Sequence, residues 1–474
     1  MAPSAEAAPE IRLTSWSPSA HGVVLRADFQ DGGAPLNVTI AWGDGSEQTV
    51  ASDGSTYVGE VHKYAEVGKY TITVTVTNPA SGTQAVNKVD VETWGSDFNP
   101  HAPLRLLDTR NGTGTDKSKI LPKQPAVVRV RGNSTMPDGV TAVVLNVTVT
   151  NTTTSGHITG VGSGAPDTGT SSINYGPGET VPNLMILPVS SDGNVYVWNE
   201  GWESVDLIAD ITGYFTKSAS SGYVSLSPTR VVDTREGQGA AKRQVAGQGS
   251  FSTQIGGVGG VPKGATAVSL NVTVTNPREA GHLTVHPSGQ QTPTASNLNF
   301  TPGQTVANSV IVPVGPDGKI VVRNGSWQPT DVVIDVNGYY APDSSAAYMP
   351  PQYQASRLFD TRESGHPLAA RDIYRQSFDV DLQHVEAFVL NTTVTNTTGA
   401  GFLSVTSDSG KPEQAGNGSP IPPARPISSV LNWTAGKTVA NFAQVRPGKA
   451  ISYWNQGWEN IDLIVDYYGS YNTD

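Results

Sequence analysis

The stretch RLLDTR occupies residues 105–110, and it returns as RVVDTR at 230–235 and as RLFDTR at 357–362. The aspartates of the three copies are spaced by 125 and 127 residues. Other motifs recur at similar spacing: LNVTVTN at 145–151 and 270–276 with LNTTVTN at 390–396, and VDLIADITGYF at 205–215, TDVVIDVNGYY at 330–340 and IDLIVDYYGSY at 461–471. A repeat of this length far exceeds a solenoid unit, so each copy is expected to form a self-contained domain.

Within a repeat, short apolar stretches alternate with Gly/Pro turns, and no 3.6-residue period is sustained. This pattern is typical of a β-sandwich or a jelly-roll-like domain. The sequence therefore predicts an all-β protein of four tandem β-sandwich domains. The expected ranges are a flexible arm at 1–9, one sandwich at 10–94, and three homologous repeats at 103–217, 223–342 and 353–474. Segments rich in Pro, Ser, Gly or Ala near 94–103, 217–222 and 341–352 are expected to be linkers.

The composition excludes several classes of function. A net charge of −11 argues against binding to nucleic acid or to an anionic membrane. The absence of cysteine excludes disulfides, thiolate metal sites and a cysteine nucleophile. No apolar run is long enough to span a membrane. The first ten residues, MAPSAEAAPE, lack the features of a secretory leader, so we expect either a leader already removed or release by another route, such as lysis.

The Asp-Thr-Arg part of the motif resembles the Asp-Thr-Gly of aspartic proteases. An arginine occupies the glycine position, however, and would keep nearby carboxylates ionised. A structural role explains the motif better. Each repeat ends in an apolar strand that contains an aspartate, which is costly to bury unless it is paired. Because domain termini usually lie close together, we predict three bidentate ion pairs that close each repeat: Arg110–Asp210, Arg235–Asp335 and Arg362–Asp466.

The stretches VWNEGW at 197–202, VRNGSW at 322–327 and YWNQGW at 453–458 also correspond. A tryptophan can stack on the apolar face of a sugar while neighbouring amides bind its hydroxyls. The candidate ligand-binding residues are Trp198, Asn199, Trp202, Asn324, Trp327, Trp454, Asn455 and Trp458. The alternative is that each Trp caps the sandwich core while the Asn forms a hairpin turn.

Other polar candidates are weaker. His157 and His282 correspond, but Phe402 replaces them in the third repeat, which favours a packing role. Asp44 alone provides too few oxygens for Ca²⁺ and is expected in a turn. No nucleophile, base and oxyanion donor converge in the sequence, so we predict no catalytic residue, no metal and no cofactor.

Two resemblances bear on function. The stretch WGDGS at 42–46, followed by HKYAEVGKYTITVTVTN at 62–78, resembles a PKD domain, which implies an immunoglobulin-like sandwich. Residues 103–472 resemble the LDTR repeats of secreted or surface proteins of actinobacteria and of minor tail proteins of their phages. This second resemblance implies an extracellular or virion setting and brings no catalytic residues.

The sequence thus leaves two functions open. The first is a non-enzymatic virion-surface protein, such as a tail fibre, minor tail or decoration protein, that binds host-envelope glycans through multivalent β-domains. The second is a secreted bacterial module that binds cell wall or polysaccharide as an accessory to a hydrolase. The expected partners are virion structural proteins or host-surface glycans, without nucleic acid or membrane insertion, and a homo-oligomer stays open.

Overall fold

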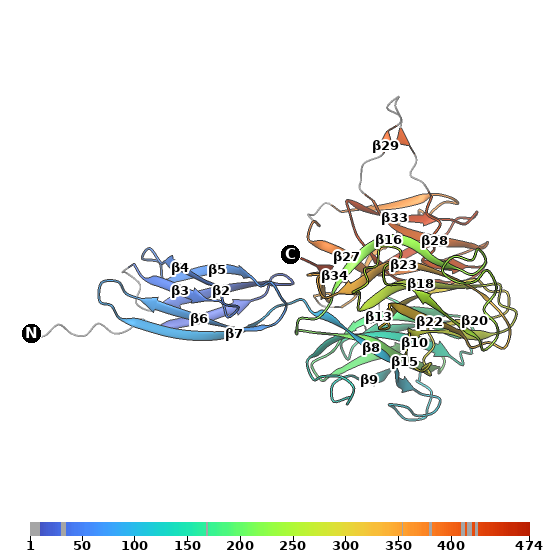
Figure 1. Cartoon of the computed structure of the whole chain (residues 1–474), viewed down its shortest axis with the longest axis horizontal. Helices are drawn as coiled ribbons and strands as arrows, with labels where there is room; N and C mark the ends of the chain where they lie inside the picture. Colours follow the sequence, from blue (N-terminus) through green and yellow to red (C-terminus); the bar gives the residue numbers. More distant parts are fainter. Residues whose placement is uncertain are drawn as a thin grey trace, which may run out of the picture. The chain divides into compact units, whose positions relative to one another are not determined.

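The computed structural model describes residues 10–29, 35–166, 169–352, 354–378, 382–408 and 425–474, with the backbone of two short strands, β29 (Glu413–Gln414) and β30 (Pro420–Ile421) (Figure 1). The predicted arm at 1–9 lies outside the described residues. The chain is all-β, as predicted, and among the described residues its helix is the single turn α1 (Thr361–Ser364). No described helix therefore has the length or hydropathy needed to cross a membrane.

The chain divides into two compact units. The first comprises the residues up to Asp97 with Lys217–Ala219 and Thr473–Asp474, and the second comprises Phe98–Thr216 and Ser220–Asn472. All three repeats therefore lie in one unit rather than in three. The repeat boundaries at 103, 223 and 353 stay predictions.

The first unit contains two antiparallel sheets. One sheet has the order β1 (Ile11–Trp16), β2 (Gly22–Phe29), β5 (Tyr57–Lys63), and the other has the order β4 (Glu47–Ala51), β3 (Asn37–Ala41), β6 (Lys69–Thr77), β7 (Gln84–Glu92). In β6 the strict alternation of the sequence buries Ile72, Val74 and Val76 completely, while the intervening threonines stay partly exposed.

Each repeat consists of an inner and an outer antiparallel sheet. In repeat 1 the inner sheet has the order β13 (Val181–Pro188), β10 (Val140–Thr150), β15 (Asp206–Thr216), β8 (Asp97–Asp108). Its outer sheet has the order β12 (Ile173–Tyr175), β11 (Gly156–Val161), β14 (Asn194–Asn199), β9 (Gln124–Arg129).

Repeats 2 and 3 have the same arrangement. The inner sheet of repeat 2 is β16 (Gly222–Asp233), β23 (Asp331–Ala341), β18 (Ala267–Thr275), β21 (Val306–Pro313), and its outer sheet is β17 (Ser250–Gln254), β22 (Lys319–Asn324), β19 (Gly281–Pro287), β20 (Leu298–Phe300). The inner sheet of repeat 3 is β24 (Ala347–Met349), β34 (Asp462–Asn472), β27 (Val385–Thr395), β32 (Val439–Val445), with β25 (Ser356–Asp360) also paired to β34, and its outer sheet is β26 (Ile373–Ser377), β33 (Ala450–Asn455), β28 (Gly401–Asp408), β31 (Leu431–Trp433).

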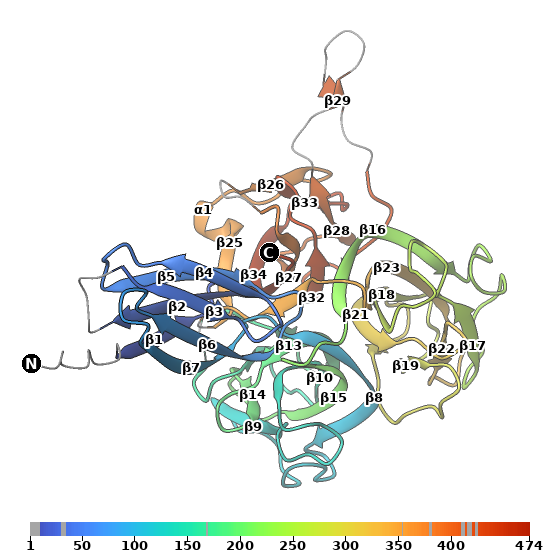
Figure 2. The ribbon, with the colours of Figure 1, turned by 60° about the vertical axis from the view of Figure 1, so that its left-hand side comes forward.

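The inner sheets pack around a common centre. Strands β13, β21 and β32, one from each repeat, contact one another in pairs, and Figure 2 shows them side by side at the middle of three lobes. The strands in the middle of the inner sheets are consequently covered on both faces, by their own outer sheet and by the neighbouring repeats, whereas β8 and β16 at the edges stay partly exposed. This explains why β10 is buried along nearly its whole length.

The predicted linker at 94–103 is wrong, because most of it pairs as a strand, and the predicted linkers at 217–222 and 341–352 are interrupted by shorter paired stretches. Strand β8 includes residues 97–103, β16 begins at Gly222, and β24 lies at 347–349. An aromatic residue within or directly after each segment, Phe98, Tyr223 or Tyr348, is at most 1% exposed and holds the chain at that point.

These aromatic residues form an axial cluster of six rings: Phe98, Phe215, Tyr223, Tyr340, Tyr348 and Tyr471. The ring centroids of Phe98 and Tyr340 are 4.0 Å apart, and those of Tyr223 and Tyr471 are 4.6 Å apart. The third pair, Tyr348 and Phe215, is 4.8 Å apart. The first strand of each repeat thus packs on the last strand of another in the cyclic order 1–2–3–1, and the three repeats form a closed ring.

Glycine at the end of the last strand makes this cluster possible. A Cβ atom at Gly213 would lie 2.2 Å from the Phe98 ring, and one at Gly338 would lie 2.2 Å from the Tyr223 hydroxyl. The third equivalent, Gly469, has φ +126° and faces Tyr348. The Gly of the recurring GYF, GYY and GSY stretches therefore leaves space for the axial ring.

Candidate functional site

The first arginine of each Arg-x-x-Asp-Thr-Arg motif pairs with the late aspartate of the same repeat. Arg105 donates from Nε and Nη2 to the two carboxylate oxygens of Asp210, at 2.9 and 3.2 Å. The equivalent pairs, Arg230–Asp335 and Arg357–Asp466, have the same fork geometry, with Nε to Oδ1 at 2.9 Å in each. The three aspartates are at most 1% exposed.

The predicted pairs Arg110–Asp210, Arg235–Asp335 and Arg362–Asp466 are therefore wrong in their choice of arginine. In repeat 2, Arg230 lies directly opposite Asp335 in the register of β16 and β23, whereas Arg235 follows the end of the strand. The second arginine instead returns to its own motif: Arg110 donates to Asp108 at 2.9 and 2.8 Å, and Arg235 and Arg362 do the same to Asp233 and Asp360.

The electrostatics of the two aspartates in a repeat differ. Hydrogen bonds from Arg110 lower the pKa of Asp108, against the opposing effect of burial. Burial raises the pKa of Asp210, and the hydrogen bonds from Arg105 offset only part of that increase. Arg105 also contacts Asp108 at 3.0 Å and so bridges both carboxylates. The motif is an ion network built around two buried carboxylates.

Each ion pair is completed by the next repeat of the ring. The backbone N–H of Ser296 in repeat 2 donates to Asp210 at 3.3 Å, and Arg105 donates to the carbonyl of Thr294 at 3.1 Å. The backbone of Ser429 hydrogen bonds to Asp335 in the same way, and that of Ser171 to Asp466. The contacts again run in the order 1–2–3–1, so the motif closes both the repeat and the ring.

A second set of polar contacts, which the sequence interpretation missed, follows the same order. Asn146 donates to the carbonyl of Ser296 at 2.6 Å and accepts from Asn308 at 2.9 Å. The equivalent amide pairs are Asn441 to Asn271 at 3.1 Å and Asn183 to Asn391 at 2.9 Å. The signal was present in the sequence, because each LNVTVTN or LNTTVTN stretch places an amide inside an otherwise apolar strand.

The asparagines that directly precede the tryptophan loops (residues 200–205, 325–330 and 456–461) are structural. Asn199, Asn324 and Asn455 are fully buried. Asn199 donates to the carbonyls of Ile120 and Glu203 and accepts from the N–H of Gly201, and the other two asparagines make equivalent turn contacts. Their prediction as ligand-binding residues is wrong, because the loop backbone already uses their amides.

The loop tryptophans are exposed to solvent, in contrast to these buried asparagines. Trp202, Trp327 and Trp458 are 78%, 77% and 76% exposed. The predicted alternative, in which these rings cap the core, is therefore wrong. Trp454 is buried, and Trp198 is partly buried in the outer sheet, so neither ring is as open to a ligand as the loop rings.

All three exposed rings lie at one end of the second unit. Each tryptophan loop precedes the last strand of its repeat, whereas the axial aromatic residue stands at the far end of that strand. An 11-residue strand such as β15 spans about 35 Å. The loops are therefore separated from the axial cluster by the length of the inner sheet, and they share one face of the ring.

The remaining sequence candidates have local roles. The His282 ring packs over the loop backbone, since a Cβ at Gly325 would lie 2.3 Å from it, and burial lowers the pKa of both His157 and His282. Asp44 accepts from Ser46 and lies 2.8 Å from His62, within a turn of the first unit.

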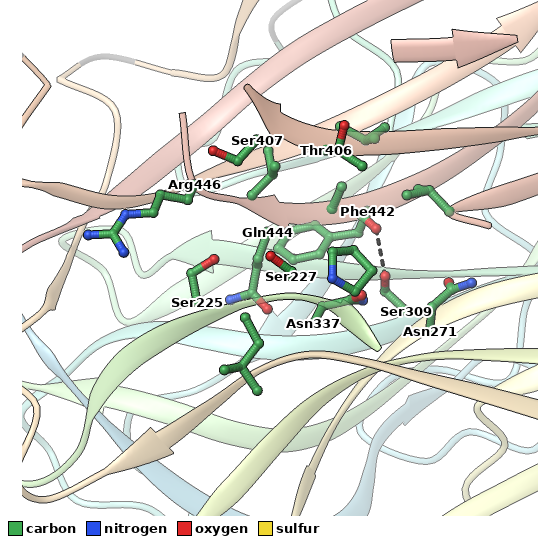
Figure 3. Close-up of a pocket in the computed structure, with 16 residues that line it drawn as sticks. Ser225, Ser227, Asn271, Ser309, Asn337, Thr406, Ser407, Phe442, Gln444 and Arg446 are labelled. Atoms are coloured by element: carbon green, nitrogen blue, oxygen red, sulfur yellow. Dashed lines mark hydrogen bonds between the residues drawn. The ribbon is translucent and has the colours of Figure 1, made fainter. Parts of the chain in front are cut away.

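Two cavities of the second unit lie at seams between repeats. A cavity of about 210 Å³ lies between repeats 2 and 3, and Figure 3 shows Ser225, Ser227 and Asn337 on one side and Thr406 and Ser407 on the other. Of the lining residues, Arg446 alone carries a charge, and it pairs with Glu386 at 3.3 Å. The described lining residues thus offer hydroxyls and amides without an adjacent base to activate them.

Comparisons with known proteins identify one part of the chain. Residues 8–91 match the family model of the PKD domain, which confirms that resemblance. No curated protein matches the chain.

Three solved structures that are similar to this chain have low scores. A SusE-like protein has 12% identity over 43% of this chain and 97% of its own, with a TM-score of 0.15. The structure of Sulfolobus Turreted Icosahedral Virus has 10% identity over 83% and 88%, with a TM-score of 0.17. An archaeal virus structure described by a triple jelly roll fold and turret assembly has 10% identity over 86% and 90%, with a TM-score of 0.16. Scores this low carry no weight for the function.

Proposed function

We propose that the chain is a non-enzymatic surface protein that binds glycans of a cell envelope through the tryptophan loops of its three repeats. The observation that carries this proposal is the threefold recurrence of an exposed tryptophan at one end of a closed ring. An exposed indole costs solubility, and its flat apolar face suits the apolar face of a pyranose. Three sites on one rigid body provide avidity, which exceeds single-site affinity by about 10²–10⁴-fold when the geometry allows simultaneous binding.

The proposed setting is the surface of a virion, as a tail fibre, minor tail or decoration protein. It is supported by the resemblance of the three repeats to the LDTR repeats of such proteins, and a PKD domain is compatible with it. Immunogold electron microscopy of the source material, with antibodies against the second unit, tests this setting. Label on phage particles supports it, and label confined to the bacterial wall would instead support the secreted binding module.

Binding is tested by pull-down of the full chain on purified host-envelope polysaccharide. The triple variant Trp202→Ala, Trp327→Ala and Trp458→Ala should lose about 10²-fold or more of its apparent affinity. Trp16→Ala is the matched control, because Trp16 is also exposed, at 55%, but lies in the first unit. Equal binding of the triple variant and the wild type would overturn the proposal.

A further inference from the structure

The tryptophan loops of repeats 1 and 3 carry different charges beside the same ring. In repeat 1, Lys123 lies 5.2 Å from the centre of the Trp202 ring and pairs with the buried carboxylate of Glu200 at 2.8 Å. Repeat 3 has Arg371 in the place of Lys123, 5.0 Å from the Trp458 ring, and Gln456 in the place of Glu200. The cation is therefore kept in repeat 3, while its carboxylate partner has become a neutral amide.

A second arginine reinforces this difference. Arg371 donates to the side-chain oxygen of Gln456 at 3.2 Å, and Arg425 donates to the same oxygen at 3.3 Å. Arg425 also donates to the carbonyl of Arg371 and lies 5.9 Å from the ring of Trp454. Within the described residues, neither guanidinium has a carboxylate oxygen within 4.0 Å.

The positive charge of Arg371 and Arg425 is not balanced by a carboxylate among the described residues. Two permanent cations converge on one neutral oxygen, and their mutual repulsion is relieved when an anion binds between or beside them. The planar guanidinium fork matches the oxygens of a carboxylate or a phosphate. The adjacent Trp458 ring, 76% exposed, offers an apolar platform at the same place.

We propose that repeat 3 carries a site for an anionic saccharide, a sugar ring with a carboxylate or phosphate substituent, in which Trp458 stacks on the ring and Arg371 and Arg425 bind the acidic group. This inference rests on the proposed glycan-binding function and specifies its ligand class for one of the three repeats. Repeat 1, whose cation is neutralised by Glu200, then takes neutral sugars, so these two loops of one chain differ in selectivity.

The test uses the full chain with Trp202→Ala and Trp327→Ala, which leaves Trp458 as the exposed loop ring. Its indole N–H signal is followed by NMR during titration with methyl glucoside, methyl glucuronide and glucose 6-phosphate at low salt. We expect at least one anionic probe to bind about tenfold or more tightly than the neutral sugar, and this preference should fall as salt is added. The preferred probe, carboxylate or phosphate, identifies the source of the acidic group.

Two variants in this background separate charge from stacking. Arg371→Gln with Arg425→Gln should remove the preference for the anionic probes and leave binding of methyl glucoside unchanged. Gln456→Glu recreates the ion pair of repeat 1, and it should remove the preference while retaining both arginines. A preference that survives in both variants would overturn the inference.

The outcomes also distinguish the inference from the function on which it rests. If all three probes bind with equal affinity, the anionic site is disproved and glycan binding stands. If no probe shifts the Trp458 signal at any concentration, the glycan-binding function fails together with the inference.

Discussion

The Arg-x-x-Asp-Thr-Arg motifs and the tryptophan loops recur equally often in this chain but lie in opposite environments. Asp108 and Asp210 are at most 1% exposed and are held by arginines of their own repeat, and Asp210 also by the backbone of the next. The loop tryptophans are more than three-quarters exposed. The first feature recurs because the fold needs it in every repeat. The second contributes little to the fold, so its recurrence points to a surface that acts in triplicate.

The largest effect should come from breaking the buried ion pair. Arg105→Ala leaves the buried carboxylate of Asp210 without its cation and should lower the free energy of unfolding by about 3–5 kcal/mol. Arg110→Ala is the matched control, because Arg110 is 44% exposed and Asp108 keeps its contact with Arg105. Its cost should be about 1 kcal/mol. If urea denaturation shows the same loss of unfolding free energy in both variants, Arg105 does not have the special structural role proposed here.

The amide contacts between repeats should have the next largest effect. Asn271→Ala removes the acceptor of Asn441 and a donor to the carbonyl of Ser429, and should cost about 1–3 kcal/mol in the same assay. Asn174→Ala serves as control, since its side chain donates to Ser171 of its own repeat. If both variants lose the same small amount, the contacts between repeats do not stabilise the ring.

The turn of the PKD domain offers a polar cluster that is not repeated. Partial burial would raise the pKa of Asp44, but hydrogen bonds from Ser46 and His62 bring it down to about 2. The charged form therefore stabilises the fold above about pH 4, and this contribution of about 1–2 kcal/mol is lost as the pH falls from about 4 to about 2. Asp44→Asn should flatten the stability of the first unit over that window. An unchanged pH dependence in acid denaturation would contradict this role.

The smallest change in stability is expected at the tryptophan loops. Trp202→Ala should alter the free energy of unfolding by no more than about 0.5 kcal/mol, because little of the ring is buried. A thermal melt of the full chain checks this. A large drop in the melting temperature would mean that the ring supports the fold, and the contrast between the two repeated features would then disappear.

Particular residues show how far the sequence could be interpreted. Alternation and turn composition predicted the all-β fold, and the GDG and HKYAEVGKY stretches predicted the PKD domain, because these are local signals. The ion pair was placed on the correct aspartates but on the wrong arginine, because the choice depends on the register of β16 and β23. A one-dimensional pattern does not specify that register across about 100 residues of intervening chain.

The closed ring was not foreseen for a similar reason. The aromatic residues Phe98 and Tyr348 stand in Pro- and Ser-rich segments, and composition alone made these segments look flexible. These residues are buried by aromatic rings of other repeats. Those rings are far away in the sequence, so a local sequence pattern does not predict the contact. The same limit applied to the candidate site. The asparagines and the loop tryptophans lie three residues apart in the sequence, but the asparagines are buried and the tryptophans are exposed.

The central claim, that three repeats are joined cyclically into one structural unit, is tested most directly by native-state hydrogen exchange in the Arg105→Ala variant. The amides of the central strands β10, β18 and β27 are the probes, because each lies in the middle of its inner sheet. We predict that protection falls by the same free energy in all three strands, since loss of one seam opens the ring. Loss of protection confined to β10, with β18 and β27 unchanged, would contradict the account.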